Sequence, residues 1–369
     1  MKLGIDASNI RTGGGLRHLV ELISHANIAE SGFNEAIIWA SQKTLDQLPD
    51  REWLIKHTHP FLNQSLILRV IWQKFYLSRE AERLCDILFL PSGNTSSFHP
   101  YVSMCQNLLP FEPEEKKRYG LSLTRLRLEL LKKNQCNSFR KSDGTIFLSE
   151  YSLNQVENIC GTIKSVEIIP HGAPSDCGIG KRTNQNTPIQ LLYVSTIDMY
   201  KHQWNVVQAL HQLLDGGYKV DLTLIGSSYG PALKKLMYAI EERPEYKSKI
   251  KVLGGIPHSE LKTYYQKADV FVFASSCETF GMIVLEAMAN GLPLVCSKKS
   301  SMKEIVQDAG TYFNPEQPND IALAIKRLLD NKMLVKEMSE ASLKKSSHYS
   351  WNSTAVATFQ YLNSFVNKE

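Results

Sequence analysis

Residues 270–297 read VFVFASSCETFGMIVLEAMANGLPLVCS and contain two short apolar segments separated by a longer one. The first segment, VFVFAS (270–275), is rich in branched and aromatic residues, as expected of a strand that is buried on both faces. The middle segment is apolar at helical spacing and is closed by Gly291 and Pro293, which are helix stop signals. The order strand, helix, strand predicts a βαβ unit of a parallel sheet.

The same alternation extends in both directions along the chain. In the first half, we expect strands at KLGID (2–6), AIIWA (36–40), DILFLP (86–91) and GTIFLS (144–149). In the second half, we expect strands at QLLYVS (190–195), VDLTLIGS (220–227), KVLGG (251–255), VFVFAS (270–275) and LPLVCS (292–297). Helical segments such as Arg17–Ala26 and Leu66–Arg83 lie between the strands. The chain is therefore predicted to be an α/β protein with two Rossmann-like domains.

The length of the chain and one polar segment predict where the domains meet. A chain of 369 residues is longer than a single core usually serves. Residues 173–188 are polar and rich in turn-forming residues, so we interpret them as a linker. The predicted domains are then residues 1–173 and 174–351. Ligands bind outside the carboxyl ends of parallel strands, and we expect the loops of both sheets to face each other across a cleft.

Composition excludes several classes of protein. With 43% hydrophobic and 21% charged residues, the chain has the composition of a globular protein. A net charge of +5 is too small to indicate nucleic-acid binding. The seven cysteines are odd in number and lack a C-x-x-C pair, which favours reduced thiols. No signal peptide and no apolar run of 18 residues is found, so a cytoplasmic location is expected.

Two segments at the ends of predicted strands contain candidate binding residues. The stretch RTGGGLRH (11–18) follows the first strand, and its glycines allow backbone N–H groups to approach a phosphate at a helix N-terminus. It lacks the G-x-G-x-x-G and G-K-[ST] patterns, and a simple chain reversal explains it equally well. In YVSTIDMYKHQ (193–203), Lys201 could neutralise an anionic leaving group, although a solvated surface lysine is the alternative.

The segment 270–297 contains two carboxylates that could bind a ligand. Glu278 follows a strand, and Glu286 lies near the second turn of the helix in the apolar segment IVLEAMA. The backbone N–H groups of residues 280–282 lack intrahelical partners at this helix start, which favours phosphate or sugar hydroxyls. The alternatives are that Glu278 stabilises the helix N-terminus as a cap and that Glu286 is a solvated surface residue. An unpaired carboxylate on an apolar face would be costly, and this argues against the second alternative.

The combination of motifs resembles the family 4 retaining glycosyltransferases of the GT-B fold. In that family, a Glu is followed after seven residues by Glu-Ala-Met-Ala and Gly-x-Pro, as Glu278 is followed here by Glu286 and its neighbours. The resemblance also covers the glycines at 13–15, SEYS (149–152), IIPHG (168–172), the Lys201 stretch and YSWNSTA (349–355). It implies that a C-terminal helix, 352–369, crosses back to the N-terminal domain. The N-terminal domain then binds the acceptor and the C-terminal domain the nucleotide sugar.

The resemblance also implies roles for individual residues. Glu278 and Lys201 are expected to be catalytic. The donor-binding set is expected to comprise Gly14, Gly15, Thr196, Lys201, Gly226, Glu278, Phe280, Gly281, Met282 and Glu286. Configuration at the sugar is expected to be retained by a substitution on one face, with the leaving phosphate taking the acceptor proton.

The sequence departs from the family pattern at two places. Thr196 stands where the family usually has an arginine, so neutralisation of the diphosphate depends more heavily on Lys201. Gln106 and Asn107 stand where many relatives have a His-Asp pair. Gln106 can hydrogen-bond a sugar hydroxyl but cannot titrate, so it is expected to contact the acceptor or sugar rather than to catalyse.

No metal or cofactor is expected, because no D-x-D element is present and the histidines are scattered. Residues 115–141 combine many lysines and arginines with leucines at helical spacing, and RVIWQKFYL (69–77) adds aromatic residues. This pattern is typical of a helix on an anionic membrane surface, and equally of a core helix with a solvated basic face. The resemblance favours membrane contact.

The resulting prediction is a cytoplasmic, metal-independent, retaining glycosyltransferase of surface polysaccharide biosynthesis. Its expected donor is a nucleotide diphosphate sugar, with GDP-mannose favoured over UDP-sugars because the resemblance is strongest to mannosyltransferases of polysaccharide pathways. Its expected acceptor is a glycan, most simply a lipid-linked one. The alternatives are a synthase acting on a soluble sugar or sugar phosphate, and a noncatalytic sugar-nucleotide-binding protein.

Overall fold

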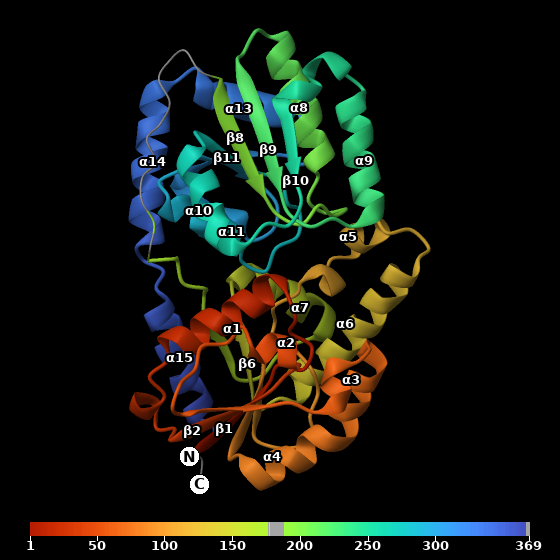
Figure 1. Cartoon of the computed structure of the whole chain (residues 1–369), viewed down its shortest axis with the longest axis vertical. Helices are drawn as coiled ribbons and strands as arrows, with labels where there is room; N and C mark the ends of the chain where they lie inside the picture. The colour runs from red at the N-terminus through yellow and green to blue at the C-terminus, as the bar shows by residue number, and fades with distance from the viewer. Residues whose placement is uncertain (176, 178–187, 367–369) are drawn as a thin grey trace. The chain divides into compact units, whose positions relative to one another are not determined.

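The computed structural model describes residues 1–175, 177 and 188–366 of the chain. It contains two compact α/β units. Unit 1 comprises Met1–Glu112, Leu121–Gly172 and Ser350–Glu369, and unit 2 comprises Pro113–Gly120 and Ala173–Tyr349 (Figure 1). The sequence-based division assigns 113–120 to the first domain, whereas in the structure this segment packs with unit 2. Most of the expected linker, 173–188, lies outside the described residues.

The core of unit 1 is a parallel sheet of seven strands in the order β3-β2-β1-β4-β5-β6-β7. Its strands are β1 (Lys2–Asp6), β2 (Glu35–Trp39), β3 (Leu54–His57), β4 (Ile87–Leu90), β5 (Tyr101–Met104), β6 (Gly144–Phe147) and β7 (Val166–Ile168). Its helices include α1 (Gly13–His25), α2 (Gln42–Leu45), α3 (Leu66–Trp72), α4 (Ser78–Leu84), α6 (Leu123–Lys141), α7 (Glu150–Cys160) and α15 (Trp351–Asn363). All four residues of β4 are fully buried, as expected of a strand covered by helices on both faces.

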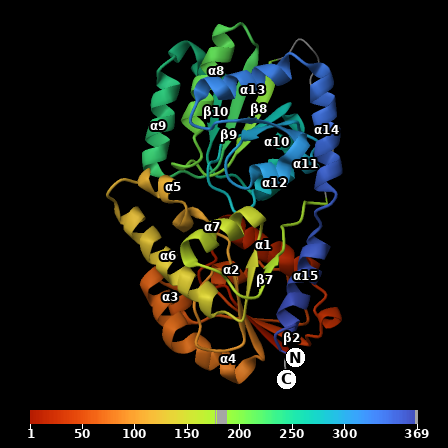
Figure 2. The same cartoon turned by 180° about the vertical axis from the view of Figure 1, so that it is seen from behind.

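Unit 2 repeats this architecture with six parallel strands in the order β10-β9-β8-β11-β12-β13. Its strands are β8 (Ile189–Val194), β9 (Val220–Ile225), β10 (Ile250–Leu253), β11 (Val270–Phe273), β12 (Leu294–Ser297) and β13 (Gly310–Phe313). Its helices include α5 (Pro113–Lys117), α8 (Gln203–Asp215), α9 (Gly230–Glu241), α10 (His258–Lys267), α11 (Met282–Ala289), α12 (Met302–Val306), α13 (Pro318–Leu329) and α14 (Lys332–Ser346). Helices cover both faces of the sheet (Figure 2).

The C-terminal helix α15 packs in unit 1, as the resemblance implied. The hydroxyl of Thr354 donates to the carbonyl of Pro170 at 2.8 Å, and the ring of Trp351 lies 5.6 Å from that of His171. Gly172 is required here, because a Cβ at this position would collide with the backbone of Trp351. Within the described part of the chain, every helix is too short or too polar to span a bilayer.

Three expectations about helices and cysteines are corrected. The expected helix 66–83 is divided by a π-helical segment, Gln73–Leu77, between α3 and α4. The expected basic helix 115–141 is two helices, α5 in unit 2 and α6 in unit 1, and Ser122 caps α6 by accepting from the N–H of Arg125. A disulfide joins Cys136 of α6 to Cys160 of α7, so the expectation of reduced thiols is wrong for these two cysteines.

Both sheets have a topological switch point beside their first strand. In unit 1, the chain runs from β1 outward to β3 and returns to β4 on the other side of β1. In unit 2, it runs from β8 outward to β10 and returns to β11 on the other side of β8. Connections that leave in opposite directions open a crevice above the carboxyl ends of the two strands, where ligands bind in doubly wound sheets.

Candidate active site

Three loops meet at the carboxyl edge of the unit 2 sheet, because β8 lies between β9 and β11. Thr196 follows β8, Gly226 follows β9 and Glu278 follows β11. The loops after β8 and β9 are joined by a parallel bridge between Ile197 and Ser228. Tertiary structure thus gathers residues that are separated by up to 82 positions in the sequence.

Lys201 and Glu278 form an ion pair at this edge. The exposed fraction of the side chain is 9% for Lys201 and 15% for Glu278, so the pair is largely shielded from water. The Nζ atom of Lys201 also lies 4.9 Å from the ring centroid of Tyr200 and 5.2 Å from that of Phe273. The cation is therefore held between a carboxylate and two aromatic faces, in a place where its charge is poorly screened.

The backbone of Glu278 is fixed by two serines that the sequence gave no reason to single out. The N–H of Glu278 donates to Oγ of Ser300 at 2.6 Å, and the Ser300 hydroxyl donates to the carbonyl of Glu278 at 2.8 Å. The Ser301 hydroxyl donates to the carbonyl of Phe280 at 3.2 Å. Both serines follow β12, and only the sheet order brings this loop beside the loop after β11.

Helix α11 begins at Met282, at the end of the segment 280–282. Gly281 precedes the helix with a φ of 96° and no side chain caps the N-terminus, and the first backbone N–H groups of such a helix favour phosphate or hydroxyl groups. A Cβ at Gly281 would lie 2.8 Å from Cε of Met302. Phe280 is buried, and its ring lies 5.6 Å from that of Tyr349. The side chain of Phe280 is therefore a core residue, and contact between its backbone and the donor stays a prediction.

Glu286 is buried on α11, but its carboxylate has partners within unit 2. The hydroxyl of Tyr265 donates to Oε2 at 2.9 Å, and Nε2 of His258 lies 3.1 Å from Oε1. These hydrogen bonds offset the cost of burying the Glu286 carboxylate. The burial of Glu286 therefore does not require a ligand. Binding of a ribose by Glu286 stays a prediction.

The loop after β8, which contains Thr196, lies close to the loop after β9, which contains Gly226. Oγ1 of Thr196 is 3.3 Å from Oγ of Ser227. Gly226 has a φ of 150°, and a Cβ there would collide with the carbonyl oxygen of Ser195. Glycine at 226 is therefore required for the close approach of the two loops.

The remaining predicted residues lie in unit 1. Gly14 and Gly15 are in the first turn of α1 rather than in a loop, because that helix begins at Gly13. No side-chain cap satisfies its N-terminus, and nothing lies within 4 Å of a Cβ placed on Gly14. Oε1 of Gln106 is 3.1 Å from the position of a Cβ on Gly15, so these two predicted residues are neighbours. Asn107 is exposed and accepts from the N–H of Leu109 at 3.2 Å.

The segment 113–120 adds residues to unit 2 that the sequence did not indicate. The hydroxyl of Tyr119 donates to Asp198 at 2.7 Å, in the loop that leads to Lys201. Arg118 donates to Glu115 at 2.6 Å and to Glu316 at 2.7 Å. The segment is thus tied to the Lys201 loop and to the loop after β13.

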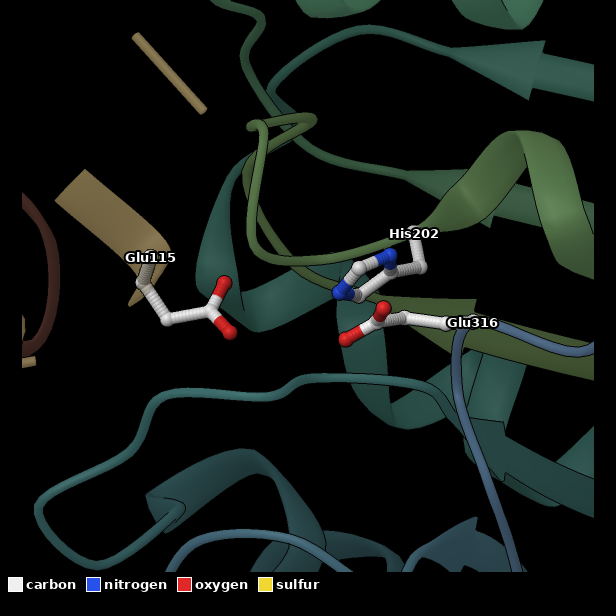
Figure 3. Close-up of side chains that lie close together, drawn as sticks. All are labelled: Glu115, His202 and Glu316. Carbon is white, nitrogen blue, oxygen red and sulfur yellow. The ribbon is translucent and has the colours of Figure 1, made fainter. Parts of the chain in front are cut away.

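Glu115, His202 and Glu316 point toward one another, with potential ligand atoms within 4.8 Å (Figure 3). Arg118 already pairs with both carboxylates, and Lys299 pairs with Glu316 at 2.5 Å. Burial and the charge of Arg118 lower the pKa of His202 to about 3, and its Nε2 atom lies 2.8 Å from the Ser276 hydroxyl. A dication would have to displace these cations, so the cluster is better explained as an ion-pair network that fixes the loops.

Residues 179–345 match the family described as Glycosyl transferases group 1. The chain contains a group 1 glycosyltransferase domain. This domain holds Lys201, Glu278 and every other site residue predicted in unit 2.

Similar proteins agree with this assignment. O-antigen chain mannosyltransferase B of Escherichia coli is 30% identical over 167 residues, which are 45% of this chain and 44% of that protein. Sucrose-phosphate synthase from Thermosynechococcus elongatus has a TM-score of 0.79 at 17% identity, with 98% of each chain covered. Anabaena Alr3699/HepE, in complex with UDP and glucose, has a TM-score of 0.69 at 17% identity, covering 98% of this chain and 97% of that chain. The predicted GT-B fold is thereby confirmed.

The chain spans about half the length of the curated relatives that it matches. Those relatives include mannosyltransferases of Escherichia coli and a glycogen synthase of Mycobacterium tuberculosis.

Proposed function

We propose that this chain is a retaining, metal-independent hexosyltransferase that moves a hexose from a nucleotide diphosphate sugar to a glycan acceptor. The observation that carries the proposal is the shielded Lys201–Glu278 pair at the switch point of the unit 2 sheet, inside the matched domain. We favour mannose and GDP-mannose, because relatives of the matched domain include O-antigen mannosyltransferases.

Lys201 is positioned to stabilise the leaving group. When the bond between the sugar and the diphosphate breaks, negative charge develops on a phosphate oxygen, and an ammonium group in a poorly solvated site stabilises that charge. The ion pair with Glu278 holds the lysine in place before the donor binds. On binding, the diphosphate replaces the carboxylate as the partner of Lys201, and Glu278 is released to accept hydrogen bonds from sugar hydroxyls.

Retention follows if both bond changes take place on one face of the sugar. The C1–O bond to the diphosphate breaks, the acceptor oxygen bonds to C1 on the same face, and the acceptor proton passes to the departing phosphate oxygen. This path needs no protein nucleophile. Lys201 supplies the positive charge that a metal supplies in other transferases, which supports the metal-independent part of the proposal.

We further propose that the acceptor is lipid-linked and that the enzyme works at the cytoplasmic face of a membrane, in surface polysaccharide biosynthesis. Helices α3 and α6 of unit 1 expose large apolar residues beside basic ones, including Ile67 and Leu123, which are 73% and 86% exposed. Exposed apolar side chains among lysines and arginines are typical of surfaces that bind anionic bilayers.

A soluble acceptor is the second candidate, because sucrose-phosphate synthase shares the fold over nearly the whole chain. A noncatalytic sugar-nucleotide-binding protein would bind donors without turnover.

A panel of GDP-, UDP- and ADP-sugars tests the donor, since a bound ligand raises the melting temperature. We expect GDP-mannose to give the largest shift. The donor that binds is then offered with detergent-solubilised lipid-linked glycans or with soluble sugars and sugar phosphates, and NMR of the product reports its anomeric configuration. Inverted product would overturn the retaining mechanism, and donor binding without turnover on any acceptor would favour the noncatalytic alternative.

A further inference from the structure

Lys201 lies in a short turn whose backbone depends on support from other segments. The N–H of Lys201 donates to the carbonyl of Asp198 at 3.0 Å. The next residue, His202, has a φ of 51°, a left-handed conformation that residues other than glycine adopt infrequently. Such a conformation persists only where the surrounding structure holds it. The position of the Lys201 ammonium group therefore depends on the groups that hold this turn.

Ser276 and Tyr193 hold the second half of the turn, residues 200–202. The N–H of Ser276 donates to the carbonyl of Tyr200 at 2.9 Å, and Nε2 of His202 lies 2.8 Å from the Ser276 hydroxyl. The Tyr193 hydroxyl donates to the carbonyl of Lys201 at 2.5 Å. Both supports come from the sheet of unit 2, because Tyr193 is in β8 and Ser276 follows β11.

The start of the turn is held by a tyrosine from the segment 113–120. The Tyr119 hydroxyl donates to Oδ1 of Asp198 at 2.7 Å, and the same oxygen accepts from the N–H of Met199 at 2.7 Å. Tyr119 is 8% exposed, so water competes poorly for this hydrogen bond. Burial and the hydrogen bond to Asp198 raise the pKa of Tyr119, and its hydroxyl is therefore a donor at neutral pH. One carboxylate oxygen thus joins Tyr119 to the backbone of the turn.

The ring of Tyr119 packs against the loop after β9. Its centroid lies 5.7 Å from that of the Tyr229 ring. The N–H of Tyr229 donates to the carbonyl of Ile197 at 2.8 Å, directly before Asp198. Tyr119 therefore contacts the turn through its hydroxyl, and through its ring it contacts the loop that is bonded to the turn.

Ion pairs anchor the segment that contains Tyr119. Arg118 donates to Glu115 at 2.6 Å and to Glu316 at 2.7 Å, and both carboxylates point toward His202 (Figure 3). Glu115 is 3% exposed, so its pairing with Arg118 is shielded from water. The segment 113–120 is thus fixed in unit 2, and it presents Tyr119 to Asp198 in a defined position.

We propose that Tyr119, acting through Asp198, is a positioning residue for Lys201. Loss of the Tyr119 hydroxyl frees the start of the turn, and the ammonium group then departs from the place where it stabilises the leaving diphosphate. Small displacements of a group that acts in the transition state are costly to the rate. The consequence for sugar transfer rests on the proposed function, whereas the restraint of the turn does not.

Hydrogen exchange, followed by mass spectrometry of peptides that cover residues 197–203, measures the restraint directly. We expect Tyr119→Phe, which keeps the ring and removes the hydroxyl, to speed exchange in these peptides at least about 5-fold. Tyr218→Phe is the matched control, because the Tyr218 hydroxyl donates to Asp330 at 2.8 Å and Tyr218 precedes β9, at the opposite edge of the sheet. This control should leave exchange in 197–203 unchanged.

Two variants of Asp198 keep the test decisive if Tyr119→Phe does not fold. Asp198→Asn retains an oxygen that accepts from Tyr119 and from the N–H of Met199, so the turn should keep most of its protection. Asp198→Ala retains no acceptor, and exchange should be at least as fast as in Tyr119→Phe. Equal exchange in the two Asp198 variants would show that the bond to Tyr119 does not hold the turn, which contradicts the proposal.

Steady-state kinetics, with the donor that the panel of nucleotide sugars selects, tests the consequence for transfer. Because Lys201 is proposed to stabilise charge in the transition state, Tyr119→Phe should lower kcat about 10-fold and change the KM for the donor less than about 3-fold. Faster exchange in 197–203 together with this loss of kcat supports the proposal. Either change without the other, or neither, overturns it.

The two measurements separate this proposal from the proposed function. If the unmodified chain transfers no sugar to any acceptor, the proposed function fails, and the exchange rates alone decide whether Tyr119 restrains the Lys201 turn. If the chain is active and Tyr119→Phe matches Tyr218→Phe in exchange and in kcat, only the positioning role of Tyr119 fails.

Discussion

The switch points of the two units have the same topology but opposite charge arrangements. In unit 2, Lys201 is paired with Glu278, and Arg118 is paired with Glu115 and Glu316. In unit 1, Arg11 and Arg69 are anchored only to neutral oxygens, and Arg127 has no hydrogen-bond partner within the described residues. A paired cation must exchange its partner when an anionic ligand binds, whereas a cation that is anchored only to neutral oxygens keeps its charge uncompensated. The same doubly wound topology thus holds its cations in two different ways.

The largest expected effect tests the exchange at unit 2. Replacing Glu278 by Ala removes the carboxylate proposed to bind the sugar and leaves Lys201 unpaired before the donor arrives. We expect transfer to fall about 10³-fold, near 4 kcal/mol, as for loss of a preorganised polar group in an active site. Initial rates of sugar transfer, measured with the donor that the panel of nucleotide sugars selects, test this expectation. Glu340→Ala, on the exposed face of α14, is the control, and full activity of Glu278→Ala would refute the site assignment.

Removing the other member of the pair should affect stability. Lys201→Met leaves the Glu278 carboxylate shielded and without its counter-charge, which typically costs about 3 kcal/mol. Urea denaturation at pH 7 measures the free energy of unfolding. The double variant Lys201→Met/Glu278→Gln should recover much of the loss, because no charge is left unpaired. Equal stability of Lys201→Met and the unmodified chain would mean that the pair is effectively solvated.

Acid should destabilise unit 1 through buried histidines. Nδ1 of His18 lies 3.1 Å from Nδ1 of His171, and burial lowers the pKa of His18 to about 4 and that of His171 as well. An unfolded histidine has a pKa near 6.5, so the unfolded state binds more protons between pH 6.5 and 4. Stability from neutral His18 is complete above about pH 6.5 and falls by about 3 kcal/mol by pH 4.

The variant His18→Gln checks this assignment, because glutamine can hydrogen-bond His171 but cannot be protonated. Its free energy of unfolding, measured from pH 7 to pH 4, should decline less steeply than that of the unmodified chain. Identical slopes would assign the acid sensitivity to other groups.

The smallest expected effect concerns the stability of unit 1 after the loss of one arginine. Arg127→Gln removes an exposed cation that has no ion pair in the described structure, and the charge of Arg127 contributes to lowering the pKa of Arg69, so the free energy of unfolding should stay unchanged or rise by less than about 0.5 kcal/mol. Urea denaturation in low salt measures it. A loss above 1 kcal/mol would show that Arg127 has a structural role.

Much of the fold could be predicted from local patterns, and most of the missed strands lie at the edges of the sheets. Every predicted strand is present, because a strand buried on both faces is a short run of branched and aromatic residues. Strands β3, β5, β7 and β13 were not predicted; β3, β7 and β13 lie at sheet edges, whereas β5 is a buried strand inside the sheet of unit 1. An edge strand such as LIKH in β3 is only partly buried, so its sequence carries no continuous apolar signal.

The candidate site was predicted only in part. Motif spacing placed Glu278 and Lys201 in loops after two strands, and the structure brings them into contact. The supports of these residues were missed: Ser300 belongs to a segment without a distinctive local pattern, and the pairing of Tyr119 with Asp198 joins two segments that are distant in the sequence. The partners of Glu286, Tyr265 and His258, were missed for the same reason.

By itself, the sequence determined the alternation of strands and helices, the presence of two α/β domains and the residues at the ends of the buried strands. These properties depend on local periodicity, which records how each segment is buried. Tertiary structure alone decided which distant segments meet: Cys136 with Cys160, Glu278 with Ser300, and Arg69 with Asn9. Such contacts depend on strand order and on which helices cover each sheet, and neither is encoded in the pattern of any single segment.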